Sequence, residues 1–153
     1  MIVNRSAPST AVVPVLVYPD VSAAIPWLCD AFGFAERLRA PGRDGTISHA
    51  QLMSGAGDIM IGAAGGPFAS PEGDRVNHLV VITVDDVDAH FKRAQSRGVR
   101  IIQPPEDMPF GARHYTAADL AGHWWTFSQN IADVDPSAWG ATVKSSSRPD
   151  ASR

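Results

Sequence analysis

The chain has 153 residues, of which 44% are hydrophobic and 19% charged, an ordinary composition for one globular domain that buries a sizeable core. Its net charge of -3 provides no basic footprint, so we expect no nucleic-acid partner. The single cysteine, Cys29, excludes an intrachain disulfide and a multi-cysteine metal site and favours the cytoplasm, and no long apolar run or signal-peptide pattern predicts membrane insertion or secretion.

The first part of the chain predicts a strand, a helix and three further strands. Residues 1–10 are polar and are expected to be frayed. Asp20 or Ser22 is a candidate N-cap, and Gly33 is placed to end the helix. The expected elements are a strand over 12–18, a helix over 23–32, and strands over 36–40, 46–53 and 58–63.

The same order begins again after a connector over 64–75 that is rich in Gly, Pro and Ser. The second series predicts a strand over 76–84, a helix over 87–97, a strand over 99–102, a Pro-rich loop over 103–111, and a hairpin over 113–129. Residues 131–153 form a C-terminal extension with Trp139 as an apolar anchor, and its tail from Lys144 onward is expected to be disordered.

The two series match each other in sequence as well as in order. Val21 corresponds to Val87, an offset of 87 − 21 = 66, and Gly57 corresponds to Gly122, an offset of 122 − 57 = 65. The repeat predicts an α+β domain over 11–130, built from two tandem βαβββ modules at about 11–64 and 76–130. Their strands are expected to form a curved mixed sheet around a cleft.

The hairpin over 113–129 carries aromatic residues on both faces of its second strand. Because side chains alternate along a strand, Trp124 and Thr126 share one face, while Trp125 and Phe127 share the other. We assign Trp125 and Phe127 to the core beneath the helices and Trp124 to a cleft wall, where a flat indole suits an aromatic ligand.

The order and spacing of these motifs resemble the vicinal oxygen chelate superfamily, which includes glyoxalase I, bleomycin-resistance proteins and extradiol dioxygenases. The resemblance covers about residues 11–130 and is carried by the βαβββ pair and four motifs. These are Pro14-Val-Leu-Val-Tyr-Pro-Asp20, Ala31-Phe-Gly-Phe34, Val84-Asp-Asp-Val-Asp-Ala89 and Asp119-Leu-Ala-Gly-His-Trp-Trp-Thr-Phe127. The first two of these motifs resemble the glyoxalase/bleomycin-resistance-like branch.

The resemblance also implies where a metal would be held, since metalloenzymes of this superfamily use His and Glu from the first and last strands of each module. The corresponding positions here are Val12, Ile61, His78 and Thr126, and a one-residue slip in the alignment would substitute Val13 or Met60, which are no better ligands. One imidazole and one hydroxyl do not provide enough donors for a divalent ion, so we expect no metal and no cofactor. A site rebuilt from His49, His78, His114 or His123 stays open.

Several polar residues are candidates for ligand binding. Polar side chains on the third strand point either to solvent or into a pocket, and Arg113 either pairs with a ligand carboxylate or phosphate or has a surface role. Asp119 is interpreted as a turn former. Phe68 and Phe110 either close over a pocket or lie in a dimer interface. The predicted ligand-binding residues are His49, Gln51, His78, Arg113, Tyr115, Trp124 and Thr126.

The leading hypothesis is a homodimeric protein that binds a small, aromatic or drug-like molecule in an apolar cleft without a metal. The alternative is a metal-dependent lyase, isomerase or dioxygenase of the same superfamily with a rearranged site, favoured by His78. A third hypothesis is a structural or regulatory protein whose cleft is filled by its own side chains. Phosphate-binding loops, nucleophile elbows and His-Glu-x-x-His pairs are absent from the sequence.

Overall fold

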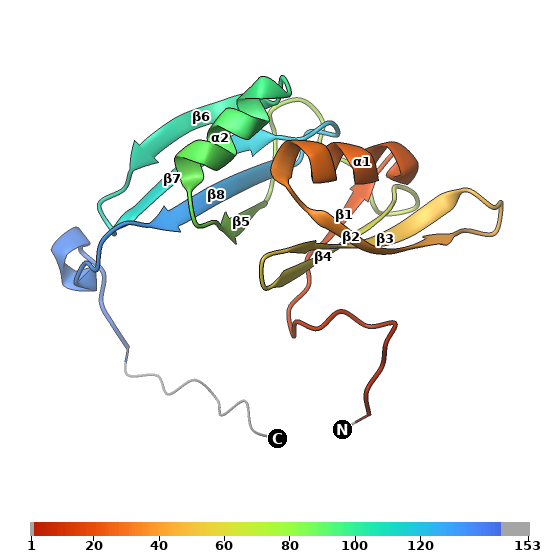
Figure 1. Cartoon of the computed structure of the whole chain (residues 1–153), viewed down its shortest axis with the longest axis horizontal. Helices are drawn as coiled ribbons and strands as arrows, with labels where there is room; N and C mark the ends of the chain where they lie inside the picture. Colours follow the sequence, from red (N-terminus) through yellow and green to blue (C-terminus); the bar gives the residue numbers. More distant parts are fainter. Residues whose placement is uncertain (1, 145–153) are drawn as a thin grey trace.

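The structure, a computed structural model, describes residues 2–144 and confirms two tandem βαβββ modules (Figure 1). The first module contains β1 (Val15–Tyr18), α1 (Val21–Phe32), β2 (Ala35–Pro41), β3 (Ile47–Ser54) and β4 (Gly57–Ala63). The second contains β5 (Leu79–Thr83), α2 (Val87–Ser96), β6 (Arg100–Asp107), β7 (Ala112–Ala118) and β8 (Trp124–Asn130), followed by a 3₁₀ turn, η1 (Pro136–Trp139).

The strands form two mixed sheets of four strands each, with the orders β1-β4-β3-β2 and β5-β8-β7-β6. In each sheet the first strand pairs in parallel with the last, and the remaining neighbours are antiparallel. Both helices lie on the same side of the two sheets (Figure 1). We call the sheet face that no helix covers the open face.

The helices begin and end where local chemistry predicts. The side chain of Asp20 accepts a hydrogen bond from the Ala23 amide, and that of Asp86 accepts one from the Ala89 amide, so both helices have an acidic N-cap. Gly33 ends α1 with φ of 73°, a left-handed conformation that glycine adopts without a steric penalty.

One hydrophobic core joins the two modules. Phe32 and Phe34, at the end of α1, contact Trp125 at ring distances of 5.9 and 5.3 Å, and Phe32 also contacts Phe127 at 4.8 Å. Trp125 and Phe127 have no exposed surface, so their predicted position beneath the helices is confirmed. Because the aromatic residues of one module pack on the last strand of the other, the modules are not independent folding units.

Hydrogen bonds reinforce this junction at two points. The Tyr18 hydroxyl of β1 donates to Asp119 Oδ2 at 2.6 Å, and Trp125 Nε1 donates to the same oxygen at 3.0 Å. On α2, His90 Nε2 donates to the Phe32 carbonyl at 2.9 Å, and Arg93 Nε donates to the Asp30 carbonyl at 2.9 Å. The second helix therefore caps carbonyl groups at the end of the first.

Three local expectations are wrong. The predicted Pro-rich loop over 103–111 is largely strand, because β6 continues to Asp107. This strand lies at the sheet edge, and its pairing with β7 shifts register between Gln103 and Glu106, so Pro104 and Pro105 fall where the ladder needs no amide donor. The strands predicted over 12–18 and 76–84 are shorter, at 15–18 and 79–83.

The third wrong expectation concerns the N-terminus. Residues 5–10 are not frayed but bond to the first sheet: the backbone amides of Ser9 and Thr10 donate to Asp58 Oδ2 at 2.7 and 2.9 Å. This segment runs on the side of the sheet opposite α1 (Figure 1). The tail predicted to be disordered lies, beyond Lys144, outside the described residues. Within residues 2–144 no helix has the length and apolar character needed to cross a membrane.

Candidate functional site

The open face of the second module exposes aliphatic side chains to solvent. Leu79 and Val81 of β5 are 43% and 60% exposed, and Val15 on β1 of the other sheet is 60% exposed. A row of exposed aliphatic side chains along a strand is typical of a binding surface. The exposure of these side chains does not fit the hypothesis of a cleft filled by the protein's own side chains.

Trp124 and Thr126 lie on this open face, as their alternation with the core residues requires. Trp124 is paired with Leu79 and Thr126 with Val81 across the parallel β5–β8 ladder. Thr126 is buried and its hydroxyl bonds to the Thr116 hydroxyl at 2.8 Å. The Trp124 indole is half-buried, and its Nε1 is shielded from solvent with no acceptor among the described residues.

His49 and Gln51 lie on the open face of the first module, where they pair across from Gly62 and Met60. His49 is half-buried. Gln51 is buried, and both ends of its side-chain amide are bonded. Its Nε2 donates to the Ser6 carbonyl at 2.9 Å, and its Oε1 accepts from Arg37 Nη1. The N-terminal segment thus covers Gln51, while His49 remains accessible on the neighbouring position of the strand.

Arg113 and Tyr115 are not on the open face. Both lie on the helix-covered side of β7, where Tyr115 is fully buried and its hydroxyl contacts His90 Nδ1 at 2.6 Å. Arg113 bonds to Asp88 of α2 at 3.1 Å and to Asp107 at 2.9 Å. These carboxylates raise the pKa of the guanidinium and occupy its donors, so neither residue enters the proposed function.

The metal positions implied by the sequence resemblance need one correction. Val15 pairs with Met60 and Val81 pairs with Thr126, so the residue equivalent to Thr126 is Met60, at an offset of 126 − 60 = 66. Ile61, the residue aligned by sequence, is instead fully buried in the core. The corrected set contains one imidazole, one hydroxyl, one thioether and the exposed aliphatic Val12, which does not fit a divalent ion.

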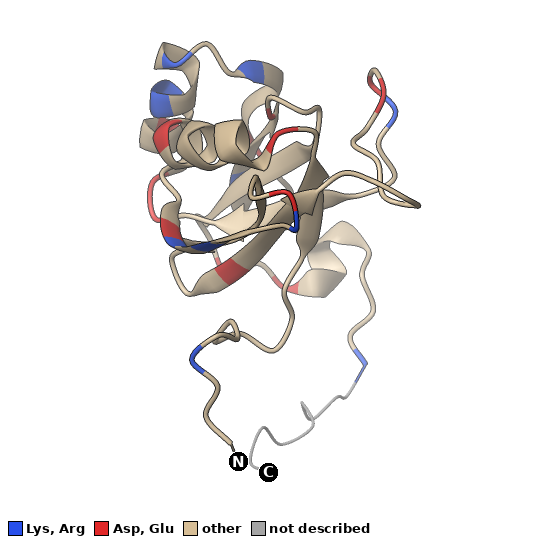
Figure 2. Ribbon diagram, turned by 90° about the vertical axis from the view of Figure 1, so that its right-hand side faces the viewer, with Lys and Arg blue, Asp and Glu red and all other residues tan. Residues whose placement is uncertain are grey.

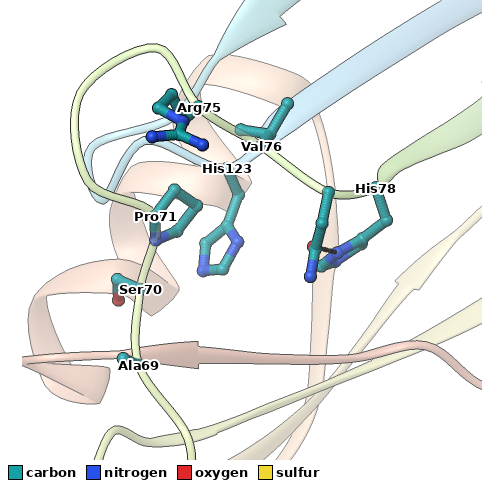
Figure 3. A pocket seen from close by; sticks show the side chains of 8 residues that line it. Ala69, Ser70, Pro71, Arg75, Val76, His78 and His123 are labelled. Atoms are coloured by element: carbon teal, nitrogen blue, oxygen red, sulfur yellow. Dashed lines mark hydrogen bonds between the residues drawn. The ribbon is translucent and has the colours of Figure 1, made fainter.

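No other metal cluster replaces this set in the part of the chain that the structure describes: no group of three or more His, Cys, Asp or Glu side chains is close enough to hold an ion. Of the histidines considered for a rebuilt site, His78 and His123 come together, with ring centroids 6.5 Å apart. They line a separate cavity beside the connector that joins the modules (Figure 3). His78 is therefore beside the open face rather than on it.

Sequence reasoning missed two features of this region. Asp119 forms the predicted turn by accepting from the Ala121 and His123 amides, but its other carboxylate oxygen also joins the two modules. Arg75 lines the cavity with the two histidines, yet it lies in a Gly- and Pro-rich connector where nothing in the local pattern indicates a site.

Several charged side chains elsewhere are paired across the surface. Basic and acidic segments are interspersed on the helices and the adjoining strands (Figure 2), and Arg97 bonds to Asp30 while Arg100 bonds to Asp74. The side chains on the open face of β5, β7 and β8 include no Asp, Glu, Lys or Arg, whereas Arg100 and Glu106 of the edge strand β6 lie on the same face. The part of that face around Trp124 is suited to ligands with little charge.

Known proteins are similar to this chain in sequence. The profile of the Glyoxalase/Bleomycin resistance protein/Dioxygenase superfamily matches residues 10–127. An uncharacterized protein of Mycobacterium bovis is 33% identical over 131 residues, covering 82% of this chain and 86% of that protein.

Solved structures similar in fold include the following two. TioX from Micromonospora sp. ML1 is 38% identical with a TM-score of 0.65, covering 82% of this chain and all of TioX. The fosfomycin resistance protein FosX from Listeria monocytogenes, solved with Mn(II) and sulfate, has a TM-score of 0.61 over 80% of this chain and 93% of FosX. At 16% identity this second likeness shows the fold alone.

Proposed function

This chain belongs to the Glyoxalase/Bleomycin resistance protein/Dioxygenase superfamily, and on that premise we propose that it binds a small aromatic or drug-like molecule without a metal. The binding surface is the open face of the second module, with Trp124 as its wall. The protein acts as a homodimer, and the reducing cytoplasm, expected from the single Cys29, is its location.

The observation that carries this proposal is the surroundings of Trp124. Its flat indole is flanked by the exposed side chain of Leu79, with Val81 next along the strand, so an aromatic ring can stack on the indole and cover the aliphatic residues. Its Nε1 is shielded from solvent and has no acceptor in residues 2–144, so the indole offers a ligand its ring face rather than a hydrogen bond.

The uncovered faces support the proposed dimer. Val15 of the first sheet and Val81 of the second are both 60% exposed on faces that no helix covers. One chain therefore leaves Val15 and Val81 exposed to water, although the N-terminal segment covers Gln51 on the first sheet, and a second copy can cover both valines while enclosing the ligand. The partner molecules we propose are thus one small ligand per site and another copy of the chain.

The metal-dependent alternative has weaker support. The corrected positions supply too few oxygen and imidazole donors for an ion, and we derive no reaction step through a metal. The Mn(II) in the FosX structure belongs to a protein that shares only the fold with this one.

Fluorescence titration tests the proposal. The probes are 8-anilinonaphthalene-1-sulfonate and bleomycin, added to the wild type, Trp124→Ala and Trp139→Ala. Trp139 is a matched control because it is a partly exposed tryptophan on η1. We expect a saturable response to at least one probe that Trp124→Ala weakens about tenfold or more, the loss of roughly 1.4 kcal/mol, and that Trp139→Ala preserves.

Two results would contradict the proposal. Equal probe affinity in the wild type and Trp124→Ala would show that the Trp124 indole is not part of the binding surface. Stoichiometric metal in protein purified without chelator, lost in His78→Ala, would favour the metal-dependent enzyme instead. Light scattering of the same samples measures the oligomeric state, and a monomer at all concentrations would contradict the proposed dimer.

A further inference from the structure

A cavity separate from the open face lies between the connector and the hairpin of the second module. We call it the connector cavity. Its volume is about 420 Å³, and its polar lining comes from Ser70, Arg75, Asn77, His78 and His123. Figure 3 shows the His123 ring between Pro71 and the His78 side chain. A space of this size accommodates a small metabolite together with a few waters.

The hydrogen bonds of His123 define what its ring offers to the cavity. His123 is only 4% exposed, and its Nε2 lies 2.7 Å from the Val17 carbonyl oxygen. A carbonyl oxygen only accepts, so Nε2 carries the proton. In the neutral ring Nδ1 is then an acceptor, and no side chain or backbone group of residues 2–144 bonds to it.

His78 presents the same kind of atom. Its Nδ1 lies 2.6 Å from the Asn77 amide oxygen, which accepts only, so Nδ1 donates and Nε2 is the acceptor. The two rings are 6.5 Å apart between centroids and both line the cavity. The cavity therefore offers two imidazole acceptors that favour a ligand carrying O–H groups.

Arg75 adds a positive charge to the same space. Among residues 2–144, no carboxylate is within salt-bridge distance of its guanidinium. The adjacent carboxylate, Asp74, pairs instead with Arg100 at 2.5 Å. No Asp or Glu lines the cavity. Arg75 is exposed and its charge has no carboxylate partner among the described residues, so its guanidinium is free to bind a ligand carboxylate or phosphate.

We propose that the connector cavity binds a small oxyanion that also carries an O–H group. Arg75 holds the charged oxygens, and Nδ1 of His123 and Nε2 of His78 accept from the hydroxyl. A monoprotonated phosphate and a 2-hydroxy carboxylate share this chemistry. The site differs in place and in charge from the apolar open face, so it binds a different class of molecule.

Titrations followed by nitrogen NMR of the histidine rings test this site at neutral pH. The probes are inorganic phosphate, lactate and propionate, which resembles lactate without the hydroxyl. We expect phosphate and lactate to shift the His78 and His123 ring signals saturably and propionate to bind about fivefold more weakly or worse. Arg75→Gln should weaken phosphate and lactate about fivefold or more.

Arg43→Gln is the matched control, since Arg43 is an exposed arginine in the β2–β3 turn, away from the cavity. Unchanged affinity in this variant, together with the loss in Arg75→Gln, supports the site. The proposal is overturned by shifts that do not saturate, by equal responses in the two arginine variants, or by propionate binding as tightly as lactate.

Discussion

The hydroxyl of Tyr18 donates to the carboxylate of Asp119 at 2.6 Å, joining residues 101 positions apart in the chain. Both residues are buried, and the burial and the neighbouring carboxylate raise the pKa of Tyr18. The hydroxyl therefore stays protonated and remains a donor over the ordinary pH range. Because Asp119 also shapes the β7–β8 turn, this bond links the position of the hairpin to β1 of the other module.

Substitution at this bond should lower stability in proportion to the donors left without an acceptor. Tyr18→Phe removes one bond to a charged acceptor, at a cost of about 1.5–3 kcal/mol. Asp119→Ala leaves four donors without their acceptor, namely Tyr18, Ala121, His123 and Trp125, and should cost more. Urea denaturation measures both, with the exposed Asp133→Asn as control; equal midpoints for all variants would contradict the role.

His90 should make stability depend on pH. Burial lowers the pKa of His90 below its usual 6.5, and the nearby positive charge of Arg93 lowers it further, while the bond to the Phe32 carbonyl opposes this shift. As the pH falls, His90 is therefore protonated at a higher pH in the unfolded chain than in the folded protein. The stability contribution is complete above about pH 6.5 and is lost as pH falls through the folded pKa.

The measurement is the urea midpoint of the wild type and His90→Gln between about pH 5 and 8, above the range where carboxylates titrate. The difference between the two should shrink at the acidic end. A difference that grows on acidification would mean that folding raises the pKa of His90.

Arg113→Gln tests the placement of this residue away from the ligand. Its guanidinium bonds to Asp88 and Asp107 on the helix-covered side, so probe affinity should stay within about twofold of wild type, less than roughly 0.5 kcal/mol. Stability should fall slightly and more at low salt, because exposed ion pairs are screened. A tenfold loss of probe affinity in the fluorescence titration would show that Arg113 takes part in ligand binding.

Asp58 should hold the N-terminal segment on the first sheet. One carboxylate oxygen accepts from both the amide and the hydroxyl of Ser9 and of Thr10, and these bonds lower the pKa of Asp58. In Asp58→Ala, hydrogen exchange at the Ser9 and Thr10 amides should accelerate about tenfold or more, equivalent to roughly 1.4 kcal/mol. Asp44→Ala, whose carboxylate bonds only within its own turn, should leave that exchange unchanged.

Gly111 should tolerate no side chain. Its φ is 84°, and a Cβ there would lie 2.3 Å from the Ala132 carbonyl oxygen, so Gly111→Ala must displace the backbone that leads to η1. Gly45→Ala is the control: φ is 82° but nothing lies within 4 Å, so only the left-handed conformation costs energy, about 1–2 kcal/mol. Thermal unfolding should show the larger loss for Gly111→Ala, and equal losses would mean that the backbone there adapts freely.

The sequence alone determined the two modules, their order of elements and the faces of the main strands. These follow from periodicity, caps and turn residues, which act over a few neighbouring positions. Trp125 and Phe127 could be assigned to the core because alternation along a strand needs no knowledge of distant segments. The same rule placed Arg113 with Tyr115, but it could not say that helix α2 covers that face.

Tertiary structure alone decided what covers each face and what meets at the junction. Asp58 holds the N-terminal segment from 48 and 49 residues away in sequence, and His123 meets the Val17 carbonyl across 106 residues. Such contacts depend on the packing of the two modules on one aromatic core, which no local pattern encodes. For that reason the sequence predicted Trp124 as a binding wall, whereas the cavity of Arg75, His78 and His123 emerged only from the folded chain.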